Sequence, residues 1–330
     1  MPRNKLVAIL LLSVCGSVVA LAGGLQSPPS TVTGACPVSP IVSNLDKSAR
    51  FYRDVIGLDL LPAPSPGPLP WNTDPSHLKL HGLPKARIRF IEARIPGVAC
   101  GIELVEFADA GQRPVHRRLQ DPGSAMLILL VRDVDAIFAR LKSAGATVVT
   151  TGGAPIFVGP AKNARAVIVQ DPDGHFIELA QLEPLPPTTA TAASNIIGIR
   201  LRITVADADK ATSFYKKTLG IDLKPGAFIK EESVMAMMGF PPAAEYRAAT
   251  AALPNSPLIF ELLEFKGVGK LKTLVSRVQD SGSFRLQLNV QDIDATLAAL
   301  NQSASPVISS RAVAKDPNNL FLVVQQRVNR

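Results

Sequence analysis

Two histidines stand four residues apart in the stretch SHLKLH, at His77 and His81. On a helix this spacing would place both imidazoles on one face, as in many pairs of zinc ligands. The stretch is followed by Gly-Leu-Pro, however, and it lacks the Glu that follows the first His in a metalloprotease helix. We therefore expect a loop or short turn whose histidines lie at the surface or at the rim of a pocket.

Other familiar catalytic arrangements are missing from the sequence. No Ser-His-Asp triad, phosphate-binding loop or dinucleotide-binding motif can be assembled from it. His116 lies among arginines and should be solvated, and His175 falls in a predicted tight turn. Any chemistry must therefore come from side chains that the fold brings together.

The N-terminus has the pattern of an export signal. Arg3 and Lys5 precede the apolar run LVAILLLSVCGSVVALA, and small residues at 20 and 22 suit signal peptidase. We predict a signal peptide at 1–22 and a protein in the periplasm or outside the cell, with no stable membrane partner after cleavage. Residues 6–22 are close to the minimum length of a membrane span, so an uncleaved anchor is the alternative.

Export determines how the cysteines are interpreted. Cleavage after residue 22 removes Cys15 and leaves Cys36 and Cys100, an even number in a compartment where thiols can oxidise. Two thiols are too few for a four-cysteine zinc site.

Composition limits the size and the partners of the protein. With 330 residues, 47% of them hydrophobic and 19% charged, the chain should form about two domains. The formal charge is +8, but the basic residues are scattered, and only three Tyr and one Trp are available for stacking on bases. We expect no nucleic-acid partner.

The two halves of the chain repeat one pattern. DKSARFYRDVIGLDLLP begins at Asp46 and DKATSFYKKTLGIDLKP at Asp209, and HGLP and IELVEF in the first half match MGFP and FELLEF in the second. Strand and helix signals divide the first half into two strand-helix-strand-strand-strand units, and the same order returns in the second. We predict a spacer at 23–35, a first domain at 36–183, a linker at 184–195 and a second domain at 196–328.

FYRDVIGLDL, the IELVEF strand and the closing DPDGHFIEL resemble the vicinal oxygen chelate (VOC) superfamily, which includes glyoxalase I, extradiol dioxygenases and bleomycin-resistance proteins. The resemblance implies an α+β fold of tandem domains, each with two βαβββ units that curl around a cavity. In metal-dependent members four inward side chains, commonly His or Glu, bind one divalent ion. Members without these ligands use the cavity to hold an organic molecule.

The resemblance assigns a residue to each of the eight ligand positions. In the first domain they are Pro37, Glu103, Met126 and Glu178, and in the second Arg200, Glu261, Arg285 and Val323. The first domain keeps two carboxylates, whereas the second keeps one beside two cations, which favours an ion pair or an anionic ligand. We expect no metal cofactor; the alternative is a divalent ion held by Glu103, Glu178 and unforeseen ligands.

The implied fold also concerns the cysteines and the longer loops of the first domain. It makes the strand after Cys36 and the strand of Glu103 parallel neighbours, so we predict a disulfide to Cys100 on the side away from the cavity, with two free thiols as the alternative. The longer loops of the first copy can border the cavity mouth, which suggests Trp71 and Phe157 as lid contacts.

The functional hypothesis is an exported protein that binds a small organic molecule in its first cavity without metal. Glu103, Glu178 and Met126 would line that cavity, and the second, degenerate domain would support it. A metal-dependent lyase, isomerase or dioxygenase of the glyoxalase type is one alternative, and a structural or partner-binding module is another. Whether a reaction is catalysed, and the oligomeric state, are left open.

Overall fold

The structure, a computed structural model, describes residues 32–63, 67–273, 275–302 and 305–326. The predicted signal peptide and residues 23–31 of the predicted spacer lie outside these ranges. Among the described residues, no helix has the length and apolar character that a membrane span requires.

The described chain contains four successive units of similar order. The first has β1 (Val32–Pro40), α1 (Leu45–Arg50), the π-helix η1 (Phe51–Ile56), β2 (Asp59–Leu61), α2 (Pro75–Leu80), β3 (Arg87–Arg94) and β4 (Gly101–Ala108). The second has β5 (Ala125–Val131), α3 (Val134–Ser143), β6 (Ile156–Val158), β7 (Ala164–Gln170) and β8 (Phe176–Leu182). The third has β9 (Ile196–Thr204), α4 (Ala208–Leu219), α5 (Glu232–Met237), β10 (Glu245–Ala252) and β11 (Ile259–Lys266). The fourth has β12 (Phe284–Val290), α6 (Ile293–Ala299), β13 (Arg311–Lys315) and β14 (Phe321–Gln326).

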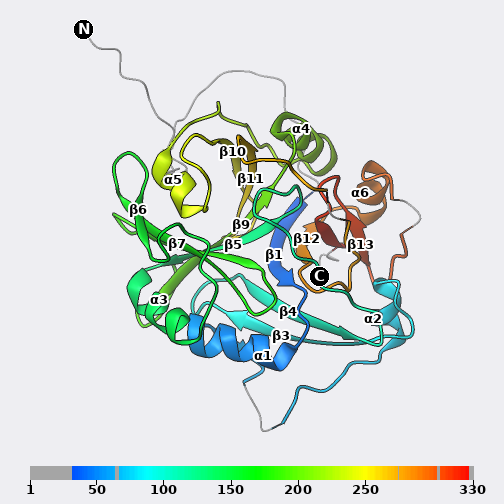
Figure 1. The fold of residues 1–330 in the computed structure, drawn as a ribbon. Coiled ribbons are helices and arrows are strands. Elements are labelled where there is room, and N and C mark those ends of the chain that lie inside the picture. The colour runs from blue at the N-terminus through cyan, green and yellow to red at the C-terminus, as the bar shows by residue number, and fades with distance from the viewer. Residues whose placement is uncertain (1–31, 64–66, 274, 303–304, 327–330) are drawn as a thin grey trace.

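Within the described ranges these strands form two curled seven-stranded sheets, which confirms the predicted α+β class. Sheet A has the order β13-β14-β12-β1-β4-β3-β2, and sheet B has the order β10-β11-β9-β5-β8-β7-β6. Antiparallel ladders join β1 to β12 and β5 to β9, and Figure 1 shows both pairs side by side. Each sheet therefore combines one unit from each half of the chain.

This pairing corrects the expectation that two consecutive units enclose one cavity. The first unit shares its sheet with the fourth, and the second shares its sheet with the third. Internal similarity shows that units are repeated, but it does not specify which strand edges meet. Only the main-chain hydrogen bonds between β1 and β12, and between β5 and β9, decide this.

The helices begin and end where the sequence indicates. The Asn44 side chain caps α1 by accepting from the Lys47 amide at 2.9 Å, and Gly57 ends η1 with a φ of 98°. A residue with a Cβ would be strained in that left-handed conformation, so the glycine sets the turn into β2. Asp133 caps α3 in the same way as Asn44 caps α1.

The repeated tyrosine is a structural residue that ties neighbouring units together. The Tyr52 hydroxyl donates to Asp171 Oδ2 at 3.1 Å, and the Tyr215 hydroxyl donates to Asp316 Oδ2 at 2.5 Å. Both tyrosines are buried. Each aspartate also accepts two backbone amides of its own turn, so the repeated Phe-Tyr helix and the DPDG-type turn form one interlocking contact.

Two short helices that the sequence reading missed cover the inner sides of the sheets. The HGLP and MGFP repeats directly follow α2 and α5. Helix α2 contacts β13, and α5 contacts β6 and β7, so each helix reaches a unit from the other half of the chain. The segment of His77 and His81 is thus a helix and its C-cap, not a loop.

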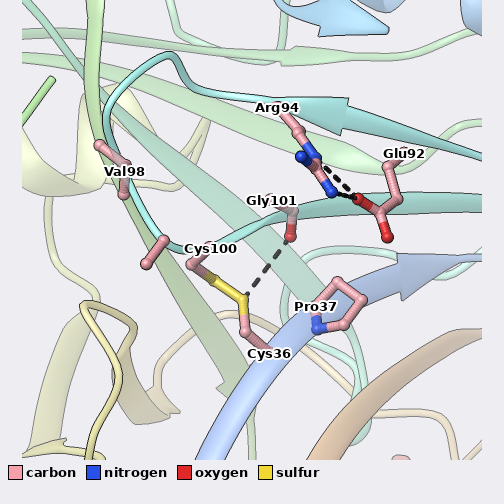
Figure 2. A pocket seen from close by; sticks show the side chains of 8 residues that line it. Cys36, Pro37, Glu92, Arg94, Val98, Cys100 and Gly101 are labelled. Atoms are coloured by element: carbon pink, nitrogen blue, oxygen red, sulfur yellow. Dashed lines mark hydrogen bonds and ion pairs between the residues drawn. A yellow bond between two sulfur atoms is a disulfide. The ribbon is translucent and has the colours of Figure 1, made fainter. Parts of the chain in front are cut away.

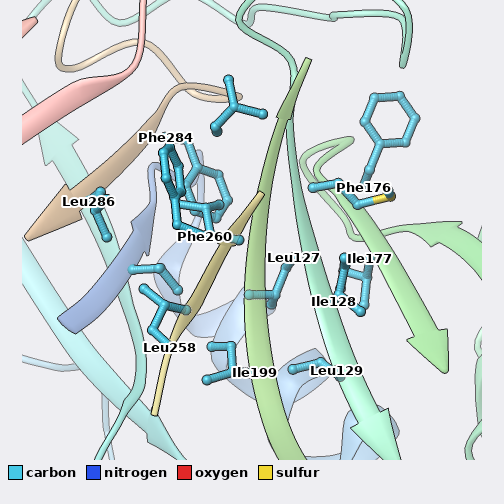
Figure 3. Close-up of a cluster of buried hydrophobic side chains, with 14 of the residues drawn as sticks. Leu127, Ile128, Leu129, Phe176, Ile177, Ile199, Leu258, Phe260, Phe284 and Leu286 are labelled. Atoms are coloured by element: carbon cyan, nitrogen blue, oxygen red, sulfur yellow. The ribbon is translucent and has the colours of Figure 1, made fainter. Parts of the chain in front are cut away.

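The two sheets share one hydrophobic core. Leu127 and Ile199 of sheet B lie near Phe284 and Leu286 of sheet A, with Phe260 between them (Figure 3). Strand residues that face the opposite way line the inner faces of the sheets. Because strand side chains alternate in direction, one set of residues builds the core while the other builds the candidate sites.

Candidate functional site

The inner face of sheet A carries Glu103 and is opposite the face on which α1 packs. The Leu45 amide of α1 donates to Glu106, three residues further along β4 and therefore on the other side of the strand. Glu103 lies across from Glu92 of β3, and only β1 lies between its own strand, β4, and β12. The inner face thus collects side chains from the first and fourth units.

Three donors converge on one oxygen of Glu103. Oε2 accepts from Ser39 Oγ at 3.0 Å, Gln287 Nε2 at 2.9 Å and Arg285 Nη2 at 3.1 Å. Ser39 and Arg285 are buried, and the Glu103 side chain keeps 16% of its exposure. The carboxylate is therefore paired with a guanidinium at the centre of the sheet and still reaches the solvent.

His81 extends this network towards α2. Arg285 Nη1 donates to His81 Nε2 at 2.6 Å, and His81 Nδ1 lies 3.0 Å from the His77 carbonyl oxygen, to which it donates. Burial, and then the Arg285 charge, lower the pKa of His81 to about 3. The imidazole is neutral at physiological pH and serves as the acceptor for a buried arginine.

A second arginine gives this face an excess of positive charge. Arg311 of β13 lowers the pKa values of His77 and Arg285, although burial is the larger cause for both groups. The Nε atoms of Arg285 and Arg311 are buried and have no hydrogen-bond partner among the described residues. Buried cationic donors without acceptors favour an anion nearby.

The inner face of sheet B carries an ion-pair network centred on Arg202. Its Nη1 lies 2.7 Å from Glu178 Oε2, and its Nη2 lies 2.8 Å from Glu261 Oε2. Arg200 Nη1 lies 3.1 Å from Glu261 Oε1. Arg202 and both carboxylates are almost fully buried, so these charges neutralise one another inside the protein.

Burial raises the pKa of Glu178, and the nearby Arg202 opposes that shift. Met126 lies opposite Arg202 in the β5–β9 ladder and belongs to the same face.

The expectation that Glu103 and Glu178 share a cavity is wrong, because they lie in different sheets. Arg200 and Arg285 are separated for the same reason.

Trp71 and Phe157 do not lie over the inner faces. The Arg87 and Arg89 guanidiniums lie over the Trp71 ring, and Arg89 pairs with Glu106 on the α1 side of sheet A. Phe157 is across from Arg165, which pairs with Asp135 of α3. The structure places both aromatic residues on the helix-covered sides, so they are not lid contacts of the two inner faces.

A pocket of about 410 Å³ lies where the inner face of sheet A opens to the solvent (Figure 2). Its lining includes Pro37, Glu92, Arg94 and Gly101, together with the Cys36–Cys100 disulfide. The cysteine Cα atoms are 5.6 Å apart. Both cysteines border the pocket instead of facing away from it. For Cys36 the reason is a register shift between residues 35 and 38, which breaks the alternation of β1.

Neither face has a donor set that fits a divalent metal ion. Sheet A offers Glu103, but Pro37 and Val323 have no ligand atom, and Arg285 already binds the carboxylate. In sheet B both carboxylates are bound by Arg202. Among the described residues, no three His, Cys, Asp or Glu side chains are grouped so that they could hold an ion.

The sequence analysis did not predict Ser39, Arg202 or Gln287 as site residues, and it placed His81 at the surface or at the rim of a pocket. Each missed residue lies two positions from a residue that it did consider, Pro37, Arg200 and Arg285. Since strand residues two apart share a face, strand alternation could have indicated all three. His81 could not be found in this way, because α2 comes from a connection and not from a strand.

Comparison with known proteins agrees with the geometry. Residues 38–179 match the family model of the Glyoxalase/Bleomycin resistance protein/Dioxygenase superfamily. No curated protein matches the sequence. Glyoxalase I from Zea mays superposes with a TM-score of 0.54 at 16% identity, covering 88% of this chain and 92% of that chain. A putative dioxygenase from Bacillus subtilis superposes with a TM-score of 0.51 at 12% identity, covering 90% and 86%.

At these identities the likeness to the solved structures shows the fold alone. The match to the family model, in contrast, rests on the amino-acid sequence of this chain. Its matched segment runs from β1 to β8 and so includes both units of the first half. Residues 38–179 therefore match the Glyoxalase/Bleomycin resistance protein/Dioxygenase superfamily, and the described residues that follow repeat the same order of strands and helices.

Proposed function

We propose that this protein binds a small organic anion on the inner face of sheet A without a metal ion. One observation carries the proposal: the Arg285 guanidinium, not a cation from solution, pairs with Glu103 at the centre of the sheet. Arg311 adds a second positive charge, and its buried Nε has no partner in the part of the chain that the structure describes. Glu103 pairs with one of these two guanidiniums, which leaves the positive charge of Arg311 for another anion.

The surroundings favour a flat ligand. The His77 ring stacks on Phe90 with centroids 5.9 Å apart and on His81 with centroids 5.5 Å apart. Phe90 is exposed, so the end of this stack is accessible from the solvent. An aromatic carboxylate could contact the ring stack and the arginines together.

The test compares benzoate, benzamide and benzylamine, which are similar in shape but differ in charge. By isothermal titration calorimetry, benzoate should bind, and the other two should bind at least tenfold more weakly. Arg311→Gln should weaken benzoate binding at least tenfold, whereas exposed Arg53→Gln should not change it. A preference for benzylamine, or equal affinity of both variants for benzoate, would contradict the proposal.

Metal content is measured on the same protein. After incubation with nickel, zinc, manganese or ferrous iron and gel filtration, elemental analysis should find far less than one ion per chain, because Glu103 is already paired with Arg285 and Glu92 with Arg94. One tightly held equivalent would overturn the metal-free proposal and favour a metal-dependent enzyme of the glyoxalase type.

We further propose that the protein acts after export. The signal pattern at 1–22 supports this, and so does the disulfide, since such bonds persist in oxidising compartments. Intact mass of the secreted protein should correspond to a chain that begins at Gly23, with no thiol alkylated in the absence of reductant. A cytosolic chain that keeps residue 1 would refute export.

A further inference from the structure

A second pocket lies where β9 and β11 begin and β5 ends, and of its lining residues only Val98 also lines the pocket on sheet A. We name it the linker pocket because residues 186–189 of the segment between the two halves form one of its walls. Its volume is about 450 Å³. The remaining walls come from Val98, Leu130, the start of β9 at 197–200, Pro257 and Ile259.

The linker wall is held in place by hydrogen bonds. Thr188 Oγ1 donates to the Ile197 carbonyl at 2.6 Å and accepts from the Ala190 amide at 3.0 Å. On its other side the linker touches the turn between β3 and β4, where a Cβ at Gly97 would lie 2.3 Å from the Thr189 carbonyl oxygen. The pocket is therefore part of the folded structure rather than a gap beside a loose connection.

The walls of the pocket are mostly apolar and carry a single charged side chain. Valine, leucine, isoleucine and proline supply most of the lining, and Arg200 is the one charged residue among the lining residues. Arg200 Nη1 pairs with Glu261, whose other oxygen is bound by Arg202. Arg200 Nε is buried and has no hydrogen-bond partner among the described residues.

This arrangement resembles a binding site for an amphiphile, a molecule with an apolar body and one polar end. An apolar cavity with a few polar groups binds ligands by burying their apolar body and fixing one polar end. A guanidinium with a donor that has no partner is suited to a carboxylate, which accepts a charge-assisted hydrogen bond from it. From the charge and the lining, we infer that the linker pocket binds a monocarboxylate with an apolar body.

The experiment uses the full secreted chain and the probe octanoate, with 1-octanol as its uncharged counterpart. Calorimetry should show one octanoate per chain and at least tenfold weaker binding of octanol. Arg200→Gln should weaken octanoate binding at least tenfold. Gly198→Leu places a side chain in the pocket and should abolish binding; its Cβ would lie 3.2 Å from the flexible end of Leu130, so the strand can accommodate it.

Arg311→Gln is the matched control, because it removes a positive charge from sheet A and leaves the linker pocket intact. Octanoate binding should be unchanged in this variant, whether or not benzoate binding is lost. Absence of octanoate binding at millimolar concentration would overturn the inference. It would also be overturned if Arg200→Gln and Gly198→Leu both melt cooperatively and bind octanoate as tightly as wild type. Loss of octanoate binding in Arg311→Gln alone would show that octanoate binds on sheet A, and this result would also refute the inference.

Discussion

At the residue scale, the candidate site depends on the neutral state of a buried histidine. His81 accepts a hydrogen bond from Arg285 and donates one to the His77 carbonyl, so both ring nitrogens are used. Protonation would add a third charge beside Arg285 and Arg311 and would remove the acceptor. The histidine therefore holds the guanidinium in place only while it is uncharged.

This predicts an acid-sensitive stability. His81 titrates near pH 6.5 in an unfolded chain, and its pKa is about 3 in the folded protein. The unfolded chain binds this proton more readily, so the contribution to stability is complete above pH 6.5 and is lost as the pH falls towards 3. Urea unfolding should show a loss of up to about 1.4 kcal/mol per pH unit from this group.

His81→Asn should remove this part of the pH dependence, while exposed His116→Asn should retain it. The measurement is the free energy of unfolding between about pH 7 and pH 4.5. Equal slopes in wild type and His81→Asn would show that His81 is not buried in the neutral form.

At the element scale, the duplicated helix and turn are tied together by a buried tyrosine and aspartate. Tyr52 joins η1 to the turn between β7 and β8, and Tyr215 joins α4 to the turn between β13 and β14. Burial raises the pKa of Asp171 and of Asp316, so each carboxylate depends on its hydrogen-bond donors. This contact explains why one phrase occurs twice in the sequence.

Tyr52→Phe and Tyr215→Phe should each lower the free energy of unfolding by about 2 kcal/mol, because each leaves a buried carboxylate without one donor. Tyr246→Phe is the control, since the Tyr246 side chain is also buried but, among the described residues, its hydroxyl makes no hydrogen bond like those of Tyr52 and Tyr215. Tyr246→Phe should change stability by less than about 0.5 kcal/mol. Equal effects of the three substitutions would mean that ring packing, not the hydroxyl, matters.

At the scale of the whole molecule, the two sequence halves are not two independent folding units. Each sheet takes one unit from each half, through the β1–β12 and β5–β9 ladders. A cut in the linker therefore breaks the chain but leaves both sheets intact. Exposed residues 191–193 allow a protease site to be inserted without touching the wall of the linker pocket.

After cleavage of such an insertion between residues 192 and 193, the two fragments should co-elute in gel filtration under native conditions and separate only in denaturant. Each half expressed alone should fail to give a cooperative melting transition, because it exposes the unpaired edges of β1 and β5, or of β9 and β12. Two separately folded halves would contradict the crossed pairing.

The sequence by itself determined the repeated units, the helix caps, the glycine ends of the helices and the superfamily that residues 38–179 match. These features depend on residue type and short spacing, which a single strand or helix already expresses. It also indicated that Pro37 and Val323 cannot bind a metal, because that follows from side-chain chemistry alone.

Only the tertiary structure decided which charges meet. Glu103 and Glu178 are separated, because strand pairing sets their neighbours. Glu103 meets Arg285, 182 residues further along the chain, whereas Glu178 meets Arg202 of the next unit. The same pairing brings α2, with His81, onto a sheet completed by the last unit of the chain. Contacts across more than a hundred residues depend on sheet register and strand order, and these are properties of the folded chain that no local pattern specifies.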